Sequence, residues 1–441
     1  MNPLNQEPRA ETRSEQLNKH CFCLSLNRDV LRQALLDELK TPQLINLIEE
    51  RCPYLFSARP VFVSQSQIQR MADVVAAVEE VVAMPSYQQY VLADAPAIAR
   101  HEPGGAKGVF FGYDFHVSED DIGLIEINTN AGGAMLNAVM ARAHQACCVD
   151  EQLAGISESA GVFESRIVDM FRTEWQLSGR QGPLHTVAIV DVAPREQYLY
   201  PEFLLFQSLF ERHGLQAVIA DPSVLKLRDG NLWHGETPID LVYNRLTDFT
   251  LEATENEVLR AAYLAHAVVL TPHPQAHALY ADKSNLALLS NAKQLQTLGV
   301  PERLQEILLD NTLAAEVVEA GNADRLWESR RKLFFKPTSG YGSRAAYRGD
   351  KMTKRVWQEV LVGSYVAQAL MTPGDRITGS KDQPTLLKFD LRSYTYDGHV
   401  QWTAARVYQG QTTNFRTVDG GFAPVYSLVD AMATCRINAC T

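Results

Sequence analysis

The sequence predicts an α/β fold in the middle of the chain and an α+β fold at both ends, and three observations support this. Strand and helix patterns alternate over residues 185–275, which is typical of a parallel sheet. Residues 108–128 contain two strand patterns joined by a tight turn, and residues 385–409 contain a second such pair. The 441 residues leave room for two or three domains, which we place at 1–184, 185–275 and 276–441.

The composition is that of an ordinary globular protein, with 46% hydrophobic and 21% charged residues. The net charge of −11 argues against a nucleic-acid partner, because no basic surface would offset the phosphates. No apolar run approaches the roughly 20 residues of a membrane span, and residues 1–19 lack the apolar segment of a secretory signal. We expect a cytoplasmic protein without a membrane partner, with a first segment of ~18 residues that is frayed.

The first third of the chain combines helices with one hairpin. Apolar residues recur at helical spacing over 29–39 and 67–83, which predicts two helices. Residues 108–117 and 122–128 are expected to be strands, and the turn at 118–121 makes them an antiparallel pair. Two further helices are expected at 134–148 and 158–178.

The alternating region begins with a buried type of strand. Its strands are expected at 186–192, 216–220, 239–243 and 267–270. Helices are expected between them at 201–213, where Pro201 occupies the first turn, and near 252–266. The last third is expected to hold strands at 333–336, 365–368, 385–397 and 400–409, and a helix near 353–362. Asp397-Gly398 predicts the tight turn of the final hairpin.

A lysine and a glycine-rich loop follow the strand near residue 334. Lys336 supplies a positive charge for phosphate oxygens, and Gly340 and Gly342 allow backbone N–H groups to approach them. A plain hairpin is the alternative, since residues 347–350 continue as a turn where a dinucleotide-binding unit needs a helix. The chain has no Gly-Lys-Ser/Thr, so it lacks a Walker A motif.

Asp114, Glu126 and Asn128 are candidate metal ligands. Glu126 and Asn128 are two apart on a strand, so they share a face, and Asp114 on the preceding strand could lie beside them. Two carboxylates and an amide oxygen suit Mg²⁺, which keeps waters and phosphates as its other partners. The alternative is a solvated hairpin face, which the apolar flank at 123–125 disfavours.

Arg392 and Arg406 lie on apolar strands, and a buried guanidinium needs an anion. Internal pairing, for example of Arg392 with Asp390 or Asp397, is one possibility. A phosphate is the other, and in that case Arg392 contacts ATP. For Arg406, which has Ala, Ala, Val and Tyr as neighbours, the functional interpretation is favoured.

In this order the motifs resemble those of the ATP-grasp enzymes, and most closely the circularly permuted branch typified by eukaryotic glutathione synthetase. In most ATP-grasp proteins the Glu-x-Asn pair comes last, whereas Glu126-Ile127-Asn128 precedes Lys336-Pro337, as in that branch. The resemblance spans roughly residues 107–426, and it is the order of the motifs that makes it specific. It implies an ATP-grasp domain at 276–441, a metal-binding hairpin within 1–184, and an inserted substrate-binding domain at 185–275.

The resemblance implies a role for each motif. The ATP contacts would be two lysines, a loop over the phosphates and a hinge strand beside adenine: Lys283, Lys336, Gly340, Tyr341, Gly342, Ser343, Val366, Gln368 and Ala369. Asp114, Glu126 and Asn128 would hold Mg²⁺, and Arg406 would stabilise the acyl-phosphate and tetrahedral states. We assign Arg245 and Asn414 to substrate contacts.

The implied activity is an ATP-dependent ligase that joins a small carboxylate to an amine, such as an amino acid or short peptide, through an acyl phosphate. A homodimer is implied as well. Gly112 stands where glutathione synthetases carry a substrate arginine, and Tyr408 replaces an ATP-contacting lysine, so the substrates stay unassigned. A small-molecule kinase, a non-catalytic nucleotide-binding protein and an α/β protein without a nucleotide site are the alternatives.

Overall fold

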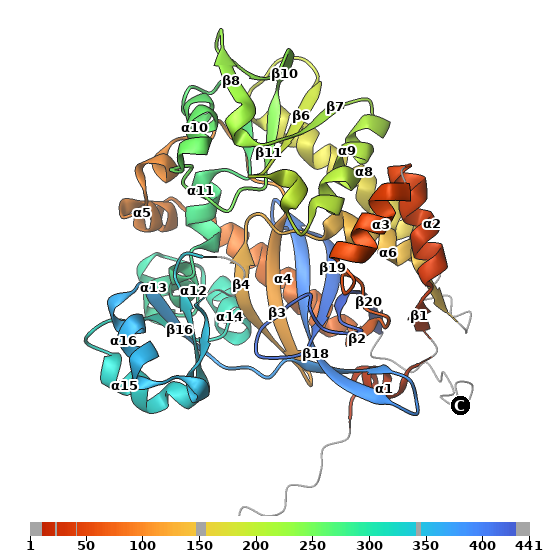
Figure 1. The fold of residues 1–441 in the computed structure, drawn as a ribbon. Helices are drawn as coiled ribbons and strands as arrows, with labels where there is room; N and C mark the ends of the chain where they lie inside the picture. Colours follow the sequence, from red (N-terminus) through yellow and green to blue (C-terminus); the bar gives the residue numbers. More distant parts are fainter. Residues whose placement is uncertain (1–10, 23, 41, 147–155, 341–344, 429–441) are drawn as a thin grey trace, which may run out of the picture.

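The structure is a computed structural model that describes residues 11–22, 24–40, 42–146, 156–340 and 345–428 (Figure 1). Its largest sheet has the strand order β2-β20-β19-β18-β3-β4, and β17 pairs with β18. These strands are β2 (Val61–Ser64), β3 (Phe111–Ser118), β4 (Asp121–Asn128), β17 (Gly374–Gly379), β18 (Pro384–Tyr396), β19 (His399–Tyr408) and β20 (Gly421–Leu428). Segments from the two ends of the chain therefore share one sheet.

Both predicted hairpins are confirmed. β3 pairs antiparallel with β4, and β18 pairs antiparallel with β19. Asp397 and Gly398 have φ angles of 47° and 74°, the left-handed conformation that a tight hairpin turn needs. The sheet is antiparallel apart from the pairing of β2 with β20, which is parallel.

The predicted alternating region forms a parallel sheet of order β12-β11-β6-β7. Its strands are β6 (Thr186–Val190), β7 (Gln216–Ala220), β11 (Leu241–Asn244) and β12 (Val269–Thr271). Its helices include α8 (Ile156–Leu177), α9 (Tyr200–Arg212) and α10 (Glu257–Leu264), with η2 (Pro194–Glu196), η3 (Pro222–Val224) and η4 (Thr254–Asn256) between them. A small antiparallel sheet of β8 (Leu225–Arg228), β9 (Asn231–His234) and β10 (Thr237–Ile239) projects beside it (Figure 1).

A third sheet has the order β13-β16-β14-β15 and lies among helices at the lower left of Figure 1. Its strands are β13 (Ala315–Val317), β14 (Leu333–Pro337), β15 (Tyr347–Arg348) and β16 (Tyr365–Ala369). The segments around it are α11 (Pro274–Ala276), η5 (His277–Ala281), α12 (Ser284–Leu289), α13 (Ala292–Thr297), α14 (Glu302–Asn311), α15 (Ala323–Ser329), η6 (Arg330–Lys332), η7 (Gly349–Lys351) and α16 (Lys354–Val362). β14 and β15 are antiparallel, so the glycine-rich segment does connect two paired strands.

The remaining elements belong to the first third of the chain. They are α1 (Arg13–His20), β1 (Leu24–Leu26), α2 (Arg28–Leu39), α3 (Pro42–Arg51), α4 (Gln65–Val82), α5 (Pro85–Ala93), η1 (Ala97–Arg100), α6 (Ala134–Ala143) and β5 (His144–Ala146). The helix expected at 134–148 ends at residue 143, and β5 begins at the next residue and pairs with β1. Residues 147 and 148 lie outside the described part.

The expectation of a frayed segment up to about residue 18 is wrong for residues 13–18, which belong to α1. Thr12 closes a capping box with Glu15, which satisfies free N–H groups of the first turn. Asn18 exchanges two hydrogen bonds with the backbone of Phe62, at 2.8 and 2.9 Å. These contacts with β2 are long-range, so the local pattern could not predict them.

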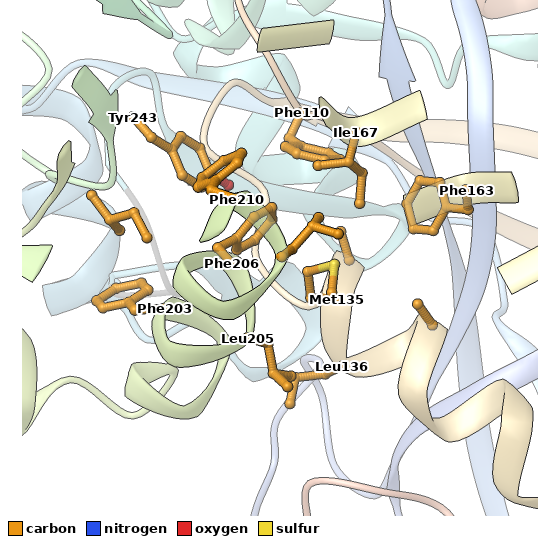
Figure 2. Close-up of a cluster of buried hydrophobic side chains, with 14 of the residues drawn as sticks. Phe110, Met135, Leu136, Phe163, Ile167, Phe203, Leu205, Phe206, Phe210 and Tyr243 are labelled. Atoms are coloured by element: carbon orange, nitrogen blue, oxygen red, sulfur yellow. The ribbon is translucent and has the colours of Figure 1, made fainter. Parts of the chain in front are cut away.

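An aromatic core joins the parallel sheet to the helices beside it. Figure 2 shows Phe206 and Phe210 of α9 beside Tyr243 of β11, with Phe110 and Phe163 close by. The ring centroids of Phe206 and Tyr243 are 5.0 Å apart, and the two planes meet at 67°. This packing fixes the end of β11, which carries the first residues of the site described next.

Candidate active site

A cavity of about 560 Å³ lies where the three larger sheets meet, a volume typical of small-molecule sites. Its walls come from β4, β14, β16, β18 and β19 and from the loops after β6 and β11. Residues predicted from sequence that line it are Glu126, Asn128, Arg245, Lys283, Lys336, Gly340, Gln368, Ala369, Arg392 and Arg406. Segments that are far apart in the chain thus contribute to one cavity.

Lys336 is held by acceptors from two strands. Its Nζ donates to the carbonyl oxygen of Ile125 at 2.8 Å and to Oε1 of Gln368 at 2.9 Å. Desolvation lowers its pKa to about 8, although Glu126 acts in the opposite direction. Lys283 precedes α12, and its Nζ donates to the carbonyl oxygen of Gly340 at 3.1 Å.

The carboxylate of Glu126 interacts electrostatically with both lysines. Desolvation acts to raise the pKa of Glu126, but Lys336 and Lys283 hold it well below its usual range. The carboxylate is therefore ionised, and it accepts a hydrogen bond from Nδ2 of Asn128 at 3.1 Å. Asn128 Nδ2 also donates to Asp114 at 3.2 Å, so the three predicted residues do lie on one face.

Asp114 is fully buried and bound by two arginines. Nε and Nη2 of Arg392 each lie 2.6 Å from a carboxylate oxygen of Asp114, and Nη2 of Arg406 lies 2.9 Å away. Arg406 also donates from Nε to Asp390 at 2.7 Å, and Asp390 accepts a hydrogen bond from Thr413. Two buried arginines and two buried aspartates thus form one network beside the cavity.

Internal pairing of Arg392 with an aspartate is confirmed, but the suggested partners Asp390 and Asp397 are wrong. Arg392 stands opposite Asp114 in the register of β18 and β3, whereas Asp390 stands opposite Arg406 in that of β18 and β19. Side chains at directly opposed positions of antiparallel strands are close neighbours, so the register decides both pairs. Both arginines still line the cavity.

Glu126 and Asn128 fit a Mg²⁺ site better than Asp114 does. Both line the cavity and carry hard oxygen donors, and Mg²⁺ commonly uses one or two protein ligands together with phosphates. Asp114 has its oxygens occupied by guanidinium groups and does not reach the cavity. The geometry therefore does not support Asp114 as a ligand. Among the described residues, no three His, Cys, Asp or Glu side chains gather as a metal cluster.

The predicted hinge strand forms part of the cavity wall, and apolar side chains adjoin it. Gln368 and Ala369 line it, whereas Val366 is buried away from it with 1% of its surface exposed. Residues that the sequence did not single out extend this wall: Leu313, Phe334, Leu370, Met371 and His116. His116 donates from Nδ1 to the carbonyl oxygen of Met371 at 2.9 Å. His116 follows Asp114 by two residues on the same strand, so the two-residue strand period could have indicated that both side chains point to the same face.

Arg245 lies at the opposite end, where the parallel sheet meets the cavity. Its Nη1 donates to the carbonyl oxygens of Asn130 and Ala131, at 2.9 and 3.3 Å, and to the hydroxyl of Tyr243 at 3.1 Å. Tyr243 is itself fixed in the aromatic core of Figure 2. Arg245 is 7% exposed, so it is a rigid part of the wall.

Asn414, in contrast, does not line the cavity. Its side chain donates to the carbonyl oxygens of Gln409 and Thr412 and accepts from the backbone of Arg416. It orders the loop after β19, and this position does not support the substrate contact expected of it. The neighbours Thr412, Thr413 and Phe415 line the cavity instead. Tyr341, Gly342 and Ser343 lie outside the described residues.

No protein-family model matches the sequence, and no curated protein is significantly similar to it. Among solved structures, the fold is similar to that of a glutathione synthetase-like effector from Globodera pallida, with a TM-score of 0.55 and 11% identity. That likeness covers 91% of this chain and 98% of the effector. A putative gamma-glutamylcysteine synthetase from Methylobacillus flagellatus gives a TM-score of 0.43 at 9% identity, over 81% and 87% of the two chains.

The likeness to the effector shows the fold. The chain has the ATP-grasp fold in the arrangement of glutathione synthetase-like proteins, as the order of its motifs predicted. Within the described residues, we find no helix that has both the length and the apolar character to cross a membrane.

Proposed function

We propose that the protein is an ATP-dependent ligase that joins a small carboxylate to an amine. The observation that carries this proposal is the convergence of Lys283 and Lys336 with Glu126 and Asn128 in one cavity, together with Arg406. The fold that the chain shares with the glutathione synthetase-like effector supports this reaction class, and the identity of 11% leaves the substrates open. ATP and Mg²⁺ belong to the proposal on the same grounds.

The cavity is divided by charge and polarity in a way that suits ATP. The apolar wall of Leu313, Phe334 and Met371 would take adenine beside the strand β16. Lys336 and Lys283, farther along, would bind phosphate oxygens. Glu126 and Asn128 would hold Mg²⁺, which when bound neutralises charge on the phosphates.

The proposed reaction has two steps that balance. An oxygen of the substrate carboxylate attacks the γ-phosphorus of ATP, the bond to ADP breaks, and an acyl phosphate forms. The amine then attacks the acyl carbon, loses a proton, and releases inorganic phosphate as the amide bond forms. Arg406 would stabilise the negative charge on the acyl oxygen. Its fixed position between Asp114 and Asp390 avoids reorganisation during the reaction.

A coupled ADP-release screen tests the proposal. Amino acids and short peptides are supplied singly and in pairs with Mg²⁺ and ATP, and products are identified by mass. We expect ADP release that needs an acid and an amine together, with an amide as product. ADP release with a phosphorylated product would indicate a kinase, and ATP binding without turnover would indicate a nucleotide-binding protein.

Two lysine variants provide the matched control. Lys336→Ala should abolish turnover and weaken ATP binding, because Lys336 lies in the cavity. Lys332→Ala removes an exposed lysine four residues earlier and should behave as the unchanged protein. Equal ATP affinity in both variants would remove Lys336 from the phosphate site.

A further inference from the structure

The carboxyl edge of the parallel sheet places two charged residues at its topological switch point. From β6 the chain first adds β7 on one side and later adds β11 on the other, so the strand order reverses between β6 and β11. Crevices at such points are where open α/β sheets bind ligands. Asp191 directly follows β6 and Arg245 directly follows β11, and both line the cavity.

The carboxylate of Asp191 is buried without a cation of its own. The residue is 9% exposed, and its Oδ1 accepts one hydrogen bond, from the N–H of Val192 at 2.8 Å. Among the described residues it forms no ion pair within 4.0 Å. Desolvation raises its pKa to about 6, more than Arg245 lowers it. A buried charge is costly unless it is paired, so this arrangement favours a ligand that brings a cation.

The guanidinium of Arg245 is engaged through one nitrogen: Nη1 makes three hydrogen bonds, whereas Nε is buried without a hydrogen-bond partner among the described residues. Nη1 supports the loop at Asn130 and Ala131, and two buried acids raise the pKa of Arg245, Glu202 more strongly than Asp191. Glu202 is 1% exposed and accepts hydrogen bonds from the N–H groups of Gly133 and Met135, at 2.8 and 3.2 Å. Two buried acids, Glu202 and Asp191, thus act on one arginine, so with both acids ionised this end of the cavity carries one excess negative charge.

The opposite end of the cavity carries the lysines. Lys283 and Lys336 outweigh Glu126 there, which gives that end a net positive charge. Leu199 and Phe203 lie near Arg245, and together with Tyr198 they line the cavity with carbon atoms that suit a short carbon chain. The cavity is thus built for an anion at one end and for an ammonium group next to apolar atoms at the other.

We propose that Asp191 binds a primary ammonium group of the substrate, as in an amino acid or the free N-terminus of a short peptide. This inference rests on the proposed function, since it names the kind of substrate that the same cavity takes. Asp191 lies directly after a buried strand and belongs to none of the motifs that the sequence analysis identified.

The test compares Asp191→Asn with Glu196→Gln. Both variants remove one negative charge from the loop after β6, but Glu196 is exposed and does not line the cavity. Binding is measured by calorimetry with Mg²⁺ and a non-hydrolysable ATP analogue present. The probes are the twenty L-amino acids and a set of dipeptides, each compared with its N-acetyl form.

We expect at least one free amine to bind the unchanged protein and Glu196→Gln, and its N-acetyl form not to bind. Asp191→Asn should weaken that binding about 10- to 100-fold, the loss of one charged hydrogen bond, while the analogue binds as before. Without ligands, Asp191→Asn should melt at the same temperature or higher, because it removes a buried unpaired charge. A lower melting temperature would mean that Asp191 serves the fold by pairing with Arg245.

The outcomes separate this inference from the proposed function. If no free amine binds, or if Asp191→Asn and N-acetylation leave binding unchanged, the ammonium site is refuted whatever the turnover. If free amines bind through Asp191 but no combination of compounds releases ADP, the ligase proposal fails and the ammonium site stands.

Discussion

ATP affinity should fall steeply above pH 8 if Lys336 binds the phosphates. Desolvation lowers the pKa of Lys336 to about 8, from an ordinary value of 10.5. Only the ammonium form attracts phosphate oxygens. Raising the pH from 7 to 9 therefore removes the charge that the site needs, without altering the polypeptide.

The magnitude follows from the protonated fraction. At pH 9, about one molecule in eleven would still carry the ammonium group on Lys336, whereas at pH 7 nearly all would. ATP that binds only the protonated form should therefore show a dissociation constant about tenfold higher at pH 9 than at pH 7. The lowered pKa of Lys336 also affects the free energy of unfolding, which should increase over the pH range in which ATP affinity decreases. Between pH 8 and 10.5 the unfolded chain binds more protons at this lysine, so the ligand-free protein gains up to about 3 kcal/mol as the pH rises.

The assay is a titration of a non-hydrolysable ATP analogue with Mg²⁺ at pH 7, 8 and 9. Lys336→Met should bind weakly at all three values and show no slope. Lys332→Met, which changes an exposed lysine, should follow the unchanged protein. Circular dichroism at each pH verifies that the variants are folded. A flat affinity for the unchanged protein, or the same slope in Lys336→Met, would refute the assignment.

Three further predictions concern the same cavity. Glu126→Gln should remove Mg²⁺-dependent turnover in a folded protein, and full activity in this variant would contradict its role as a ligand. Arg406→Ala should lower kcat more than it weakens ATP binding. It should also destabilise the fold by about 3–5 kcal/mol, because it leaves two buried aspartates short of a partner. A variant that loses only ATP affinity would make Arg406 a nucleotide contact. Gly132→Ala places a Cβ 2.3 Å from Leu199 Cδ1 and 2.9 Å from Arg245 Nη2, so substrate KM should rise while ATP affinity is kept; an unchanged KM would show that substrate does not reach this loop.

Local sequence patterns were sufficient for both hairpins, for the alternating region and for part of the site. The two-residue period of β4 placed Glu126 and Asn128 on one face, and both line the cavity. The apolar strand before Lys336 predicted β14, whose pairing with β16 brings this lysine next to Gln368. These features depend on the residues of one strand or one hairpin, which the sequence shows directly.

The pairing of charges depended on tertiary structure. Asp114 was predicted to bind a metal, yet strand register places it against Arg392 and Arg406, which come from the other end of the chain. No local pattern specifies which strands become neighbours, and a shift of one residue would change every partner.

By itself the sequence determined the hairpins, the alternating strands and helices, and which of their side chains share a face, because these follow from periods of two and 3.6 residues. Only the tertiary structure decided which charges meet across strands, that Asn414 serves its own loop, and that Asp191 lies buried at the cavity wall. Those outcomes arise when distant segments pack together and exclude water, and the local sequence pattern does not specify which polar side chains become buried in this way.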